Sequence, residues 1–433
     1  MTVRPLALLN ATVVLDTGVV EDNRTVLVED GIIKAIEGHV APSLLDDAYD
    51  LIDCSGKVLL PGLVDMKVHT GEPGNEHEET LESASRAAVA GGVTTMVVQP
   101  DTSPVIDDMA LVEFVLRNAR ATAVAKVHAM GALTKGLDGA ELSELRLMHE
   151  AGAVAFSNGN ASVENALVFR RALSYARDFD GLIIHHAEDA SLSQGGVMNE
   201  SEMATRLGLP GIPKAAEIIM LERDIRLTKL TGGRYHASAI SCAESVEIIK
   251  RAKDHGLKVT CGASINNVAL NENDIGPYRT FFKVSPPLRP EDDRQAIIDG
   301  IKDGTIDVVH SDHRPRDVDM KRHPFADAAD GAIGLETLLP AMLRLFHDDV
   351  LTLPDITRVL CQTPATLLNA NAGRIAKGSP ADFTLVDLHE PWVLREEDLQ
   401  SRSKNTSFEG ARFTGRVLAT YVDGIEAYRR AGF

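Results

Sequence analysis

The chain opens and closes with segments in which apolar and polar residues alternate. ATVVLDTGVV, TVLVEDG and IIKAIEG show this alternation near the start, and FTLVDL and RVLATYVDG repeat it near the end, between Gly, Pro and Asp turns. Alternation of this kind is typical of short strands with one buried face. We therefore predict a small β-sandwich domain built from both chain ends, residues 1–60 and 366–433.

The middle of the chain, residues 61–365, has a different pattern. Short apolar runs of strand length alternate there with amphipathic segments of helical length, which indicates repeated βα units and a parallel sheet. The runs cover 62–69, 94–100, 126–133, 153–157, 182–188, 235–241, 258–264 and 307–312. This number of strands predicts an α/β fold of the (β/α)8 TIM-barrel type, with functional residues at the carboxyl ends of the strands. An open doubly wound sheet is the alternative.

Composition and charge exclude several classes of protein. Hydrophobic residues at 44% and charged residues at 25% are typical of a globular chain and not of a disordered or collagenous one. The net charge of −19, without a basic run, argues against a nucleic-acid partner. We find no signal peptide and no apolar run of about 18 residues, so we expect a cytoplasmic protein without membrane contact. The cysteines lack C-x-x-C spacing, which favours a reducing compartment over a disulfide framework or zinc ribbon: Cys54, Cys242, Cys261 and Cys361.

The segment PGLVDMKVHTGEPGNEHEETLESASRAAVAGGVTTMVVQPDTSPV resembles the opening of type I dihydroorotases, in the cyclic amidohydrolase branch of the amidohydrolase superfamily. The resemblance continues through HHAEDASLSQGGVMNESEMATRLGLPGIPKAAE, FFKVSPPLRPEDDRQAIIDGIKDGTIDVVHSDH and NTSFEGARFTGRV, so it spans nearly the whole chain. It implies the barrel and terminal sandwich described above. It also implies a place in pyrimidine biosynthesis.

Hydrolysis of a cyclic amide near neutral pH needs a hydroxide nucleophile, which one or two zinc ions supply by lowering the pKa of bound water. The resemblance implies an H-x-H pair after strand 1, a carboxylate group after strand 4, one His each after strands 5 and 6, and an Asp after strand 8 that is also the catalytic base. Three ligand positions are retained: His69, His186 and Asp312. Three are replaced: Lys67, Asn158 and Ala239.

The retained ligands do not complete a site. The resemblance places His69 and Asp312 on one metal and His186 on the other, so each metal lacks the three or four protein ligands that zinc takes. We therefore expect no cofactor and interpret both histidines as hydrogen-bonded core residues. The alternative is a zinc-containing, rearranged site that recruits other histidines near the barrel mouth: His236, His310, His313 and His323.

The positions that hold the substrate carboxylate have also changed. The resemblance implies an Arg two residues after H-x-H and an Asn in M-P-N-T, where this chain has Gly71 and Asp101. Loss of a cation and gain of an anion would repel a carboxylate. The D-H-A-P-H motif of strand 8 is replaced by Asp312-His313-Arg314-Pro315-Arg316.

The position of Lys67 leads to a specific prediction. Its ammonium lies where a metal charge would neutralise Asp312, and a buried carboxylate without a partner is strongly unfavourable. We predict that Lys67 and Asp312 form an ion pair.

Compared with the family pattern, the residues for metal and substrate binding are replaced together. Packing residues are kept, such as Gly91, Gly92, Pro286 and Pro287. We predict a catalytically inactive dihydroorotase-like protein, resembling the pseudo-dihydroorotase subunits that accompany aspartate carbamoyltransferase as structural companions. It would act in an oligomer as a structural or regulatory partner of that enzyme. The alternatives are an active zinc-dependent cyclic amidohydrolase, a homodimer without this partner, and a small-molecule sensor that uses the old pocket.

Overall fold

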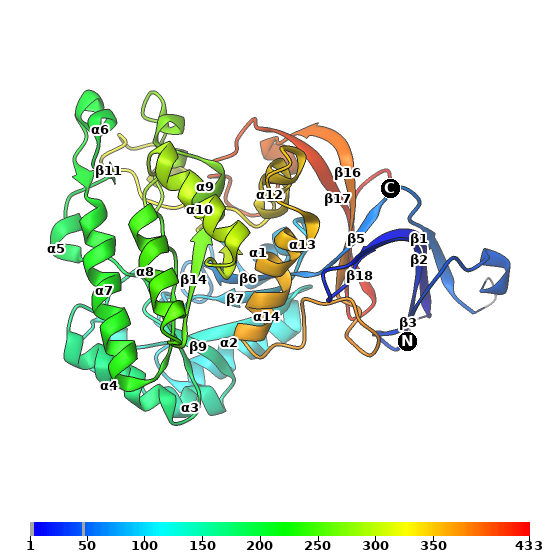
Figure 1. Ribbon diagram of the computed structural model, residues 1–433, viewed down its shortest axis with the longest axis horizontal. Coiled ribbons are helices and arrows are strands. Elements are labelled where there is room, and N and C mark those ends of the chain that lie inside the picture. Colours follow the sequence, from blue (N-terminus) through cyan, green and yellow to red (C-terminus); the bar gives the residue numbers. More distant parts are fainter. Residues whose placement is uncertain (1–3, 46–47) are drawn as a thin grey trace.

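The computed structural model describes residues 4–45 and 48–433. They form a parallel barrel and a mixed β-sheet that lie side by side along the long axis (Figure 1). This confirms the predicted fold class. Residues 1–3 and 46–47, which belong to the predicted N-terminal part of the sandwich, lie outside the described residues. None of the described helices combines the length and hydropathy needed to cross a membrane.

The barrel wall consists of parallel strands that are neighbours in the order of the chain. They are β6 (Leu63–Val68), β7 (Val93–Val98), β8 (Lys126–Ala132), β9 (Ala153–Ser157), β10 (Leu182–His185), β13 (Arg234–Ala237), β14 (Val259–Ser264) and β15 (Val308–His310). Each overlaps one of the predicted runs. β13 ends earlier than its run, although Ser238 N and Ile240 N still donate to His185 O and Gly262 O of the neighbouring strands, each at 2.9 Å.

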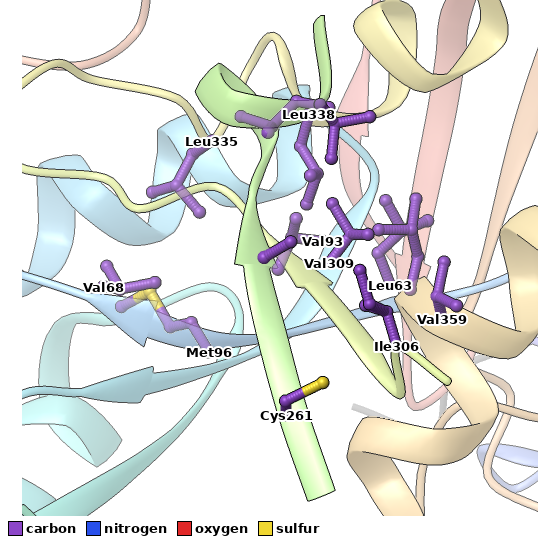
Figure 2. Close-up of a cluster of buried hydrophobic side chains, with 14 of the residues drawn as sticks. Leu63, Val68, Val93, Met96, Cys261, Ile306, Val309, Leu335, Leu338 and Val359 are labelled. Atoms are coloured by element: carbon purple, nitrogen blue, oxygen red, sulfur yellow. The ribbon is translucent and has the colours of Figure 1, made fainter. Parts of the chain in front are cut away.

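The first and last barrel strands meet just beyond their carboxyl ends. Val68 forms a parallel bridge with His313, and His69 N donates to His313 O at 2.8 Å. Figure 2 shows Leu63, Val93 and Val309 gathered at the other end of β6, away from Val68, and all three are buried. The barrel is therefore nearly closed, and the residues that follow β6 and β15 are held next to each other.

Helices cover the outside of the barrel (Figure 1). The longer ones are α1 (Leu81–Ala90), α2 (Met109–Thr122), α3 (Leu145–Glu150), α4 (Ala166–Arg177), α7 (Lys214–Thr231), α8 (Ala243–Asp254), α10 (Glu291–Asp303) and α12 (Leu338–His347). Shorter elements belong to the connecting loops: α5 (Ala190–Ser193), β11 (Met198–Asn199), α6 (Glu202–Leu207), β12 (Gly211–Ile212), α9 (Ile265–Ala269), α11 (Val318–Lys321), α13 (Leu353–Thr357) and α14 (Thr363–Leu367). Polar N-caps such as Thr80 and Asp108 accept backbone N–H groups and fix where α1 and α2 begin.

The second domain unites the two chain ends in one mixed sheet. Its strands are β1 (Leu6–Val14), β2 (Val20–Glu29), β3 (Ile32–Glu37), β4 (Asp50–Asp53), β5 (Val58–Pro61), β16 (Phe383–Val393), β17 (Arg412–Val422) and β18 (Ile425–Arg429). β5 runs parallel to β1 and antiparallel to β16, so it joins the N-terminal and C-terminal strands. Leu8, Val26 and Phe383 share one buried core, which ties the ends together.

Candidate functional site

The positions identified from the sequence lie at or near the carboxyl ends of the barrel strands and are buried. Their exposed fractions are 2% for Lys67, 7% for His69, 1% for Asn158, 2% for His186, 2% for Ala239 and 5% for Asp312. What the residues do there differs from a metal centre.

Lys67 and Asp312 form a buried ion pair. Lys67 Nζ lies 3.0 Å from Asp312 Oδ1, which confirms the predicted contact. The neighbouring carboxylate of Asp65 aligns the two chain segments, because it accepts Lys67 N at 3.0 Å and Ser311 N at 3.2 Å. The meeting of β6 and β15 thus places an ammonium against the carboxylate that the family uses as its base.

The surroundings of Asp312 set its charge state. Burial alone would raise its pKa, but the positive charge of Lys67, with smaller contributions from His310 and His69, holds the pKa at about 2. Asp65 shows the opposite balance, since burial raises its pKa to about 6. Asp312 therefore keeps its negative charge to a lower pH than Asp65 does.

A second chain of charged groups crosses the barrel mouth. His69 Nδ1 lies 2.8 Å from Asp101 Oδ1, and Arg314 places its guanidinium 3.9 Å from Asp101 and 3.4 Å from Asp330. Burial would raise the pKa of Asp101, but His69 and Arg314 hold it well below its usual range. Burial lowers the pKa of His69 itself, so the aspartate in the family's Asn position is held by a hydrogen bond from His69 and by the charge of Arg314.

Hydrogen bonds fix the segment that carries Arg314 over the barrel mouth. Arg316 Nε donates to Asp330 O at 2.9 Å, and Asn405 Nδ2 donates to Arg314 O at 3.1 Å. Lys321, only 3% exposed, donates to the carbonyls of Thr280 at 3.1 Å, Lys283 at 3.3 Å and Ala329 at 2.8 Å. Burial lowers the pKa of Lys321 to about 7. These bonds hold the segment between β15 and α12 in one place.

Gly71, in the family's Arg position, has no room for a side chain. A Cβ built on it would lie 1.8 Å from Asn75 O, and Asn75 N donates to Gly71 O at 2.5 Å. The turn formed by residues 71–75 therefore excludes an arginine without a shift of the backbone.

The remaining ligand positions are also occupied with other contacts. Asn158 accepts Thr134 N at 3.1 Å and donates to Thr134 Oγ1 at 2.8 Å, so its amide serves a loop. Ala239 has no donor atom. His186 has no hydrogen bond to either ring nitrogen among the described residues, and its nearest carboxylate is that of Glu188 at 3.8 Å. The expectation of a hydrogen-bonded core histidine thus holds for His69 and is wrong for His186.

The histidines that could rebuild a metal site are separated by their own partners. His236 Nδ1 lies 2.8 Å from Thr260 Oγ1, and His310 Nε2 lies 2.9 Å from Ser238 O. His313 is fully buried, with Nε2 3.5 Å from Glu79, and His323 is exposed on a loop. These contacts give the rearranged zinc site no support.

The donor set does not fit a zinc centre. Among residues 4–45 and 48–433, no group of three or more His, Cys, Asp or Glu side chains has an arrangement that could hold a metal ion. The ammonium of Lys67 also lies against Asp312, where a metal cation would meet like charge.

Sequence reasoning missed how Arg314 and Asp330 act. Asp101 and Arg314 depart from the family pattern with opposite charges, and this complementarity is the signal that could have paired them. No pattern singles out Asp330 or Glu79, because their roles depend on loops that meet only in the folded chain.

Replacing Lys67 tests the ion pair. Lys67→Met leaves Asp312 buried without a partner, and we expect a loss of about 3–5 kcal/mol in the free energy of unfolding, measured by denaturant titration at pH 7. Lys67→Met with Asp312→Asn should recover most of the loss. The control is Lys250→Met, because the Lys250 side chain is 58% exposed.

The same measurement has a defined pH dependence. The folded pKa of Asp312, about 2, lies below the ordinary 3.8, so its stabilisation is present above pH 4 and is lost as pH falls towards about 2. The difference in the free energy of unfolding between wild type and Lys67→Met should therefore become smaller as pH falls from 4 towards about 2. A constant difference would contradict the ion-pair explanation.

Comparison with known proteins agrees with the barrel and the terminal sheet. Residues 56–245 match the family model described as Dihydro-orotase-like. Dihydroorotase from Anaplasma phagocytophilum is 41% identical over 383 residues, which cover 88% of this chain and 85% of that protein. Dihydroorotase from Desulforapulum autotrophicum is 40% identical over 419 residues, which cover 96% and 97%.

Solved structures show the same architecture. L-hydantoinase from Arthrobacter aurescens matches with a TM-score of 0.87 and 26% identity, covering 97% of this chain and 95% of that one. Dihydropyrimidinase from Brevibacillus agri shares the fold, with a TM-score of 0.85, 21% identity and coverage of 99% and 96%. With full-length relatives at about 40% identity, the chain belongs to the dihydroorotase family.

Proposed function

We propose that this protein is a catalytically inactive member of the dihydroorotase family in which ion pairs have replaced the metal centre. The observation that carries the proposal is the buried contact of 3.0 Å between Lys67 and Asp312. An ammonium cannot ligate a metal, and its charge opposes the entry of one. The family's base is at the same time held as the partner of a cation.

The substrate side of the site supports the same proposal. Gly71 leaves no space for the cation that binds a substrate carboxylate in the family. Asp101 adds an anion that already accepts a hydrogen bond from His69 and lies 3.9 Å from the guanidinium of Arg314. A carboxylate substrate would have to displace Arg314 from Asp101 and then face that anion.

We further propose that the chain is a structural or regulatory partner of aspartate carbamoyltransferase in a cytoplasmic oligomer. The resemblance to inactive dihydroorotase-like subunits supports this role. The retained barrel, with its buried core and pinned loops, offers a stable surface even without catalysis. A net charge of −19 favours a more basic partner by complementary electrostatics.

Metal content and turnover test the loss of activity. Protein purified without chelator should contain far less than one zinc per chain and should not hydrolyse dihydroorotate. The dihydroorotase of Desulforapulum autotrophicum, purified and assayed in the same way, is the comparison. Zinc near two per chain together with hydrolysis would favour the active enzyme and refute the proposal.

Restoring ligands tests the assignment of positions. The variant Lys67→His, Asn158→Asp, Ala239→His returns three donors to the three retained ones, so zinc affinity should rise above that of the wild type. Hydrolysis of dihydroorotate should stay at background, since Gly71 and Asp101 still fail to orient a carboxylate. Turnover at ordinary enzyme rates would show that these two positions are wrongly assigned.

Co-expression with the aspartate carbamoyltransferase of the same genome tests the partner. We expect a mixed complex by light scattering at low salt, and we expect it to weaken as salt rises because exposed charges are screened. A carbamoyltransferase that assembles and works alone, beside a separate homodimer of this chain, would contradict the partnership.

A further inference from the structure

We propose that a cavity on the outer side of the barrel mouth binds a small organic anion, with a carboxylate or phosphate head and an apolar body. The cavity has a volume of about 390 Å³ and lies between the segment after β15 and the loop that precedes β17. This volume is within the range of small-molecule sites. We call it the outer cavity. It is separate from the positions of the family's metal ligands.

Three cations line the outer cavity and retain binding capacity. The Arg402 side chain has no ion pair or hydrogen bond within the described part of the chain. Lys404 Nζ donates to Leu399 O at 2.8 Å and Ser401 O at 2.7 Å, which leaves one of its three N–H groups. Arg316 reaches carboxylates only at 3.5 Å (Asp330) and 3.9 Å (Glu78).

The acidic groups in the lining do not cancel these cations. Asp317 is bound to His77, at 3.0 Å. Glu396, Glu409 and Arg402 are exposed, whereas Arg316, Lys404 and Asp317 are partly buried. The partly buried lining therefore holds two cations and one carboxylate, and that carboxylate already contacts His77.

The surroundings of Arg316 leave its guanidinium available to an anion. Burial and the nearby Arg314 lower the pKa of Arg316, while the carboxylates of Asp330, Glu78 and Asp101 act in the opposite direction. The contacts of Arg316 with Asp330 and Glu78 are long, at 3.5 and 3.9 Å, so its guanidinium is not closely paired with a carboxylate. Guanidinium groups bind carboxylate and phosphate heads through paired N–H donors.

The lining also offers apolar contact. The half-buried ring of Phe281 faces the cavity, and Val318 is 56% exposed at its edge. A ligand with an apolar body would cover both side chains. Together with the cations, this favours an organic anion over a bare inorganic one.

Isothermal titration of the full chain with four probes tests the proposal. Benzoate and phenyl phosphate carry the anionic heads on an apolar ring, benzamide is the neutral shape match of benzoate, and inorganic phosphate lacks the ring. We expect saturable millimolar binding of benzoate or phenyl phosphate. The tighter of the two identifies the head group, and benzamide and inorganic phosphate should bind at least tenfold more weakly.

Two substitutions locate the binding. Arg402→Gln removes a cation without known partners, so the fold should be unaffected, and binding should weaken at least fivefold. Arg322→Gln is the matched control, because Arg322 is 72% exposed on the neighbouring loop and does not line the outer cavity. Its effect should stay within twofold.

Any of three results would overturn the proposal: absence of saturation for both ringed anions, equal binding of benzamide, or unchanged affinity in Arg402→Gln. None of these results depends on zinc content or hydrolysis. The proposed ligand site in the outer cavity and the proposed loss of catalysis are therefore tested independently.

Discussion

The end of the barrel is organised by the need to neutralise a buried carboxylate. Asp312 follows β15 and lies among closely packed strand ends, where an unpaired negative charge is strongly unfavourable. In this chain, neutralisation comes from Lys67, which is part of the polypeptide. The folded barrel consequently needs no added ion for this charge, and non-covalent contacts between residues of the chain itself hold the ends of β6 and β15 together.

The same principle extends outward from this pair. Asp101 is hydrogen-bonded to His69 and faces Arg314, and Asp330 lies 3.4 Å from Arg314. The charges that this chain has gained at Lys67, Asp101 and Arg314 thus have partners within the chain. The pairing of buried charges within the chain therefore accounts for both the stable core and the packed barrel mouth. It also explains how a fold that binds a metal in the family stays ordered with the residues of this sequence.

Much of the fold could be predicted from the sequence because it depends on local periodicity. The runs at 62–69 and 153–157 became β6 and β9, since strand alternation and length are visible in a single chain. The contact of Lys67 with Asp312 could also be predicted, since burial demanded a partner. The pinning of Arg314 could not, because it requires Asp330 and Asn405 to meet it across long loops.

The turn at Gly71 has an evolutionary consequence. Because a Cβ there would collide with Asn75 O, a return to arginine requires the backbone to move first. A substitution at position 71 alone would therefore introduce a clash, and a change in the turn alone would supply no side chain. Any side chain at this position must arise together with a new conformation of residues 71–75.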